Sequence, residues 1–113
     1  MKRKDHRDLF PGALEMMILH TLRRTPLHGY ALAQHLKQAS DDLLRIEEGS
    51  LYPALQRLLK EGWVEADWAV SDRNRRIRRY KITAAGRKEL AREVSRFDQM
   101  LQGIARVMRP AQS

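Results

Sequence analysis

The sequence predicts a mainly α-helical protein with one small β-hairpin and a long C-terminal helix. Apolar residues recur at helical spacing over most of the chain. The spacing changes to the alternation of a strand only between residues 63 and 83. The 113 residues suit a single domain, since domains typically hold about 100–150 residues.

Two helices are predicted first. One is expected to begin at Ala13, after Pro11-Gly12, and to end before Pro26; the other runs from His28-Gly29-Tyr30 to about Ala39. His28 is interpreted as a capping or packing residue, with a sensing role as the alternative. The apolar stripes that these helices would bury are Leu14, Met17, Ile18 and Leu22, and Leu32, Ala33 and Leu36.

A third helix is predicted to start within Glu47-Glu48-Gly49-Ser50 and to end at Gly62. Gly49 or Ser50 can serve as its N-cap. Pro53 is placed in its first turn, where the missing N–H of proline costs little. Its buried face would consist of Leu51, Ala54, Leu55 and Leu58.

The hairpin follows from a change in period. Residues 63–70 alternate, with Val64, Ala66, Trp68 and Val70 on one side. Ser71-Asp72-Arg73-Asn74 is typical of a turn, and a return strand from about Arg76 to Thr83 places Tyr80 and Ile82 together. Trp63 and Trp68 are interpreted as the core of the hairpin root, with a ligand pocket as the alternative.

The C-terminal helix, expected to run to about Met108, carries an apolar seam at alternating spacings of four and three residues. Such a heptad seam is typical of a helix that pairs with another helix. It predicts a homodimer, with packing onto its own domain as the alternative. The seam residues are Leu90, Val94, Phe97, Leu101, Ile104 and Met108.

The basic residues are unevenly placed. The formal net charge is +8 and the pI is near 10.4, and residues 73–81 contain six basic and no acidic residues. Such a cluster predicts contact with a polyanion, because phosphates relieve the mutual repulsion of the arginines and release counterions. The alternative is a solvated charged hairpin.

Several classes of protein are disfavoured. The absence of cysteine argues against a disulfide scaffold and fits a cytoplasmic protein. No apolar run is long enough for a membrane span, and the basic N-terminus lacks the apolar region of a secretory signal. The sequence contains no Gly-rich phosphate loop or nucleophile elbow, so we expect no enzyme, cofactor or metal site.

Three helices followed by a basic hairpin are the order of a winged helix-turn-helix. We therefore expect a DNA-binding domain over residues 9–83, a dimerisation helix over 84–109, and flexible tails at 1–8 and 110–113. In this arrangement the third helix enters the major groove, and the hairpin, or wing, contacts the backbone or the minor groove.

Three segments resemble the PadR family of bacterial transcriptional regulators. They are His28-Gly29-Tyr30, Leu51-Tyr52-Pro53-Ala54-Leu55-Gln56-Arg57-Leu58, and the stretch from Arg75 to Arg87. The resemblance covers roughly residues 9–108 and implies a homodimeric DNA-binding regulator, usually a repressor, of the branch with a single C-terminal helix. It leaves open a small-molecule effector of unknown identity.

The candidate DNA contacts lie on the second and third helices and on the hairpin. Gln56 is suited to adenine and Arg57 to guanine or a phosphate. Ser50 and Tyr52 are suited to phosphates, with capping and ring packing as their respective alternatives. The full set is Tyr30, Gln34, Lys37, Ser50, Tyr52, Pro53, Gln56, Arg57, Arg73, Asn74, Arg75, Arg76 and Arg78.

The competing function is a winged helix that binds RNA or another protein. RNA-binding modules usually display aromatic side chains for stacking on bases. The one aromatic residue within 73–81 is Tyr80, which the alternation assigns to the core face. The pattern therefore favours a double-stranded DNA operator.

Overall fold

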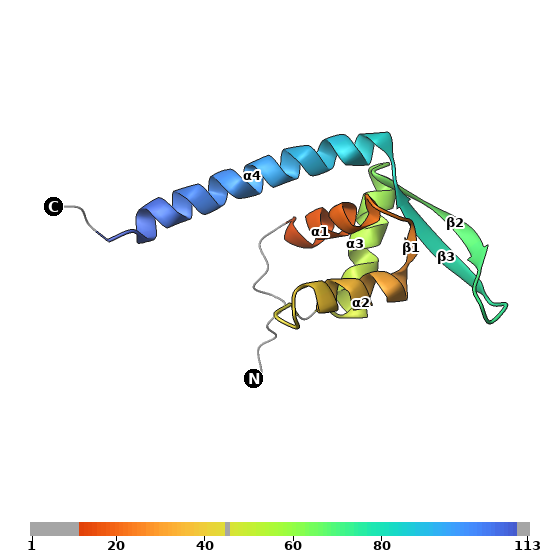
Figure 1. Cartoon of the computed structure of the whole chain (residues 1–113). Coiled ribbons are helices and arrows are strands. Elements are labelled where there is room, and N and C mark those ends of the chain that lie inside the picture. The colour runs from red at the N-terminus through yellow and green to blue at the C-terminus, as the bar shows by residue number, and fades with distance from the viewer. Residues whose placement is uncertain (1–11, 45, 111–113) are drawn as a thin grey trace.

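The computed structural model describes residues 12–44 and 46–110 and confirms the mainly helical class with a hairpin (Figure 1). The predicted tail at 1–8 and the last three residues lie outside the described residues. The elements are α1 (Ala13–Leu22), β1 (Leu27–His28), α2 (Gly29–Ala39), α3 (Glu48–Lys60), β2 (Val64–Val70), β3 (Arg76–Ile82) and α4 (Ala84–Met108).

The sheet has three antiparallel strands in the order β1-β3-β2, one strand more than the sequence predicts. The additional strand, β1, pairs Leu27 with Tyr80 and His28 with Arg79. Because β1 has only two residues, it leaves no alternating pattern in the sequence. It attaches the segment between α1 and α2 to the edge of the hairpin.

The start of α3 differs from the prediction. The N-cap is Glu47, whose backbone is extended and whose carbonyl accepts the N–H groups of Ser50 at 2.9 Å and Leu51 at 3.0 Å. The backbone thus closes the first turn without a side-chain cap, so the proposal of Gly49 or Ser50 as N-cap is wrong. Pro53 consequently lies in the second turn and not in the first.

The core lies between α1, α2, α3 and the root of the sheet. The predicted stripes of the three helices supply most of it, together with Val64 and Tyr80 from the hairpin. Trp63 packs against this core, as expected. The placement of Trp68 in the core is wrong: its side chain is 59% exposed, because β2 has by then passed beyond the helices.

The root of the hairpin is joined to α4 through Thr83. Its hydroxyl donates to the Gly62 carbonyl at 2.7 Å and accepts the Gly86 N–H at 3.0 Å, which caps α4. Its backbone N–H donates to the Trp63 carbonyl at 3.1 Å. One residue therefore ties the end of β3, the turn after α3 and the first turn of α4 together.

α4 packs on α1 over its first turns and then extends beyond the other helices (Figure 1). Leu90 belongs to the core of its own domain. From Val94 onwards the residues of the predicted seam are exposed, except Phe97, which is half-buried. The exposed part of the seam therefore begins at Val94, whereas the sequence indicates that it begins at the preceding seam residue, Leu90.

Glu89 is a buried carboxylate in this helix, 7% exposed. Burial raises its pKa above the ordinary value of 4.5, and a hydrogen bond with Glu93 raises it further. The Arg92 guanidinium, 3.0 Å from a Glu89 oxygen, opposes these effects. The folded state consequently holds the Glu89 proton more tightly than the unfolded state does.

This shift predicts a pH dependence of stability. The contribution of Glu89 is greatest below about pH 4.5 and is lost as the pH rises through the raised folded-state pKa. Glu89→Gln removes this titration, so the stability of the variant relative to the parent should increase over that range. Urea unfolding at a series of pH values tests this, with the exposed Asp98→Asn as a control. A difference that is constant with pH would contradict the assignment.

Candidate nucleic-acid interface

The outward face of α3 is formed by residues at spacings of four and three, opposite the leucines of the core. All four are exposed: Gly49, Pro53, Gln56 and Lys60. Gln56 and Pro53 were predicted as contacts, whereas Lys60 was not. Helical spacing from Gln56 alone would have found Lys60, because residues four apart lie on the same face.

Arg57 lies to one side of this face and is held by α1. Its Nε is 2.7 Å, and its Nη2 is 2.5 Å, from the same carboxylate oxygen of Glu15. The arginine side chain remains 59% exposed, so the pair is a surface contact that other anions can compete for. The structure therefore does not bring Arg57 onto the same face as Gln56.

The N-terminal turn of α2 packs closely on α3. His28 is its N-cap, with Nδ1 accepting the Ala31 N–H at 3.3 Å, as expected for a capping histidine. A Cβ on Gly29 would lie 2.6 Å from the Tyr52 hydroxyl oxygen and 2.8–2.9 Å from two of its ring carbons, so this glycine allows the tyrosine to pack on the helix. Tyr52 thus combines ring packing with partial exposure.

The remaining candidates on α2 lie at its surface. Tyr30 and Lys37 are exposed, and Gln34 is half-buried. Tyr30 and Gln34 line a hollow that His20 of α1 shares, whereas Lys37 lines another hollow with Glu47, the N-cap of α3. The structure therefore brings Lys37, but not Tyr30 or Gln34, near the start of α3.

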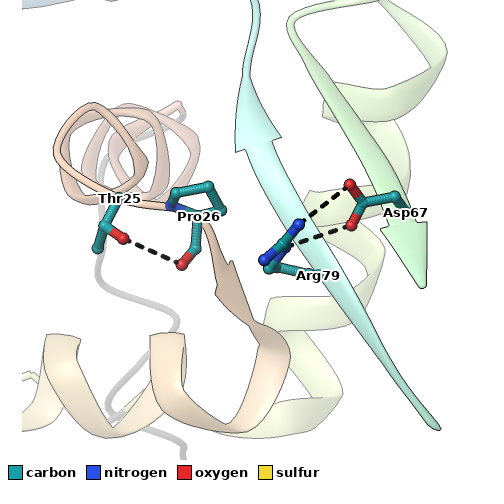
Figure 2. Close-up of polar contacts among 4 residues, drawn as sticks. All are labelled: Thr25, Pro26, Asp67 and Arg79. Carbon is teal, nitrogen blue, oxygen red and sulfur yellow. Dashed lines mark hydrogen bonds and ion pairs between the residues drawn. The ribbon is translucent and has the colours of Figure 1, made fainter. Parts of the chain in front are cut away.

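The two faces of the hairpin differ in charge. The inner face carries the even-numbered residues of β2 and β3, and the outer face carries the odd-numbered ones. On the outer face, Glu65 is opposite Lys81 and Asp67 is opposite Arg79. Figure 2 shows the Arg79 guanidinium turned toward both oxygens of Asp67, at 3.3 and 3.4 Å. Opposite charges thus face each other across the strands, so the outer face contributes little net charge.

The tip of the hairpin is built around Ser71. Its hydroxyl accepts the N–H groups of Arg73 and Arg75, each at 3.3 Å, and its N–H donates to the Arg75 carbonyl at 2.8 Å. Asn74 has a left-handed backbone, φ 61°, which asparagine tolerates better than most residues do. The turn therefore fixes the backbone from which the arginines project.

Four exposed arginines belong to this tip and to the inner face of the hairpin: Arg73, Arg75, Arg76 and Arg78. Within residues 12–44 and 46–110, the carboxylates form ion pairs with Arg57, Arg79, Arg92 and Arg96 and with none of these four. The excess positive charge is therefore concentrated at the tip, where a polyanion would meet it without having to displace a carboxylate.

The described residues contain no cluster of three His, Asp or Glu side chains that could hold a metal ion. None of the helices in this part of the chain is long and apolar enough to cross a membrane.

The family model described as the transcriptional regulator PadR-like family matches residues 18–92, from α1 into α4. The chain belongs to this family. PadR-like regulators are DNA-binding proteins and not enzymes, so the predicted class of function is confirmed.

Relatives and solved structures agree with this assignment. The chain is 35% identical over 99 residues to transcriptional regulator Rv3488 of Mycobacterium tuberculosis, in a match that covers 78% of this chain and 88% of that protein. A PadR family regulator from Eggerthella lenta is 27% identical with a TM-score of 0.76, covering 89% of this chain and 86% of the other. A transcriptional regulator from Clostridium thermocellum shares the fold, with a TM-score of 0.81 at 24% identity and coverage of 88% and 96%.

Proposed function

We propose that this PadR-like protein is a cytoplasmic homodimeric repressor that binds a two-fold symmetric DNA operator. The observation that carries the proposal is the group of four arginines without carboxylate partners at the hairpin tip. In each subunit α3 would enter the major groove, and the tip would contact the phosphate backbone or the minor groove.

Within α3, Gln56 is the proposed base-reading residue, since its amide can pair with adenine and lies on the outward face. Lys60 on the same face would contact a phosphate. Arg57 would reach the DNA only by leaving Glu15, so we assign it a secondary phosphate contact. The remaining contacts to the DNA backbone would come from Tyr30, Gln34, Lys37, Ser50, Tyr52 and Pro53.

The proposed dimer uses the exposed part of the α4 seam. Beside it, the surface has an apolar hollow of about 400 Å³ between α1, α2 and α4. Met16, Met17 and Val94 are among the residues that line it. An apolar helix face next to an apolar hollow is typical of a surface that a second subunit covers. In this proposal residues 84–109 form the dimerisation segment and residues up to 83 the DNA-binding domain.

Selection from a pool of random-sequence duplexes tests sequence-specific binding. The full-length protein should enrich two inverted half-sites whose centres lie about 10 base pairs, or a multiple of that, apart. Enrichment of no sequence, or equally tight binding to structured RNA, would contradict the proposal. Transcription in vitro from a template carrying the selected site should fall when protein is added, and a rise would contradict the repressor role.

Arg75→Ala together with Arg76→Ala should weaken binding to the selected site and to random duplex alike. The slope of log affinity against log salt should decrease by about one for each phosphate that the variant no longer neutralises. Fluorescence anisotropy at several salt concentrations measures both quantities. Arg96→Gln with Arg106→Gln is the matched control, because it removes the same charge from α4. Equal effects of the two double variants would show that only net charge matters.

A further inference from the structure

Trp68 is an exposed aromatic residue in the middle of a charged hairpin. It lies on the inner face of the hairpin, the face whose root residues, Val64 of β2 and Tyr80 of β3, are buried in the core. Farther from the root, Trp68 is 59% and Val70 is 65% exposed. Trp68 therefore lies outside the hydrophobic core of the domain.

The ring is occupied on one side by an arginine from the neighbouring strand. The Cζ atom of Arg76 lies 4.5 Å from the centroid of the Trp68 ring. The register pairs Trp68 with Arg78 and Val70 with Arg76, so the contact is a diagonal one on a single face. A guanidinium over an indole gains cation–π attraction and keeps its N–H edges available for hydrogen bonds.

We propose that Trp68 and Arg76 form one DNA-binding unit of the wing, in which the indole packs on the deoxyribose and base edges while Arg76 binds a phosphate. We infer DNA as the ligand because the two arginines beside the ring, Arg76 and Arg78, have no carboxylate partners and are therefore available to phosphates. The stack orders the arginine before binding and so reduces the entropic cost of association. The inference rests on the proposed function. It adds an apolar contact, made by the indole, to the electrostatic contact between the wing arginines and the DNA phosphates.

Fluorescence can follow this side chain directly. The protein has two tryptophans, so Trp63→Phe leaves Trp68 as the sole tryptophan, which can be excited selectively over the three tyrosines. Adding the selected duplex should shift or quench its emission and shield it from acrylamide, with saturation at the same concentration as anisotropy. An emission that does not respond to saturating duplex would overturn the proposal.

Affinity provides a second measurement. Trp68→Ala should weaken duplex binding about fivefold or more, the range expected when an aromatic contact to nucleic acid is removed. The salt slope should change less than in the Arg75/Arg76 double variant. Val70→Ala, on the same face and similarly exposed, is the matched control and should bind like the parent. Circular dichroism verifies that each variant is folded.

The outcomes separate this inference from the proposed function. If the parent protein selects a duplex sequence but Trp68→Ala binds it with unchanged affinity, the wing unit is refuted and the repressor function stands. If the parent binds single-stranded oligonucleotides more tightly than duplexes and these quench Trp68 more strongly, the ring stacks on unpaired bases. Both proposals are then wrong.

Discussion

Replacement of Leu101 and Ile104 by glutamate is expected to convert the protein to monomers and to reduce operator binding by about a hundredfold or more. The two residues lie on the α4 seam and are 42% and 40% exposed in the single chain. In a dimer built on this seam, the substitution would bury four carboxylates without partners, which costs several kcal/mol. Loss of the second DNA-binding domain then removes the gain from bivalent binding.

Light scattering gives the mass of the particle, and anisotropy with the selected duplex gives its affinity. Gln99→Glu with Gln102→Glu is the control, since it adds the same charges to the exposed α4 surface away from the seam. We expect this control to remain dimeric. A dimeric Leu101/Ile104 variant would show that the subunits meet elsewhere and that the seam assignment is wrong.

Gly86→Ala is expected to destabilise the fold by about 3 kcal/mol, a loss typical of forced overpacking in a tight site. A Cβ at this position would lie 2.0 Å from the Trp63 carbonyl oxygen and 2.8 Å from Ile82. Backbone lies on both sides of the close approach, so α4 would have to move away from the root of the hairpin. The hydrogen bonds that Thr83 makes there would be weakened as well.

Urea unfolding at fixed protein concentration measures this loss, because concentration affects the stability of a dimer. Gly103→Ala is the matched control on the same helix, since a Cβ there meets no atom within 4 Å. Alanine favours a helix over glycine by about 1 kcal/mol, so the control should be slightly more stable than the parent. If Gly86→Ala were equally stabilising, the close approach of α4 to the hairpin root would be wrong.

Most of the fold could be predicted from periodicity. The stripes through Ile18, Leu36 and Leu55 are long enough to define helices and their buried faces, and all three residues are buried. The change to alternation located the hairpin, and the helical spacing after Thr83 located α4. These features depend on residues that are close together in the chain, so they can be predicted from the local sequence pattern.

The differences arise where contacts between distant elements decide the structure. β1 exists only through its pairing with β3, and the N-cap of α3 depends on backbone bonds and not on a capping side chain. Alternation placed Trp68 on the core side of its strand correctly, but it could not indicate how far the helices extend beneath that strand. The Arg57–Glu15 pair spans 42 residues and leaves no local signal.

In the proposed dimer, the continuity of α4 would link the spacing of the two wings to the packing of the two subunits. Its 25 residues form a rod of about 37 Å that begins at the hairpin root and ends in the seam. In a dimer built on this seam, a rotation of about 5° at the far end would swing each wing root by roughly 3 Å, close to the rise of one base pair. The angle at which the two α4 helices cross would then set the separation of the DNA half-sites that the dimer can bind. Any molecule that altered this angle would change which operators the dimer binds.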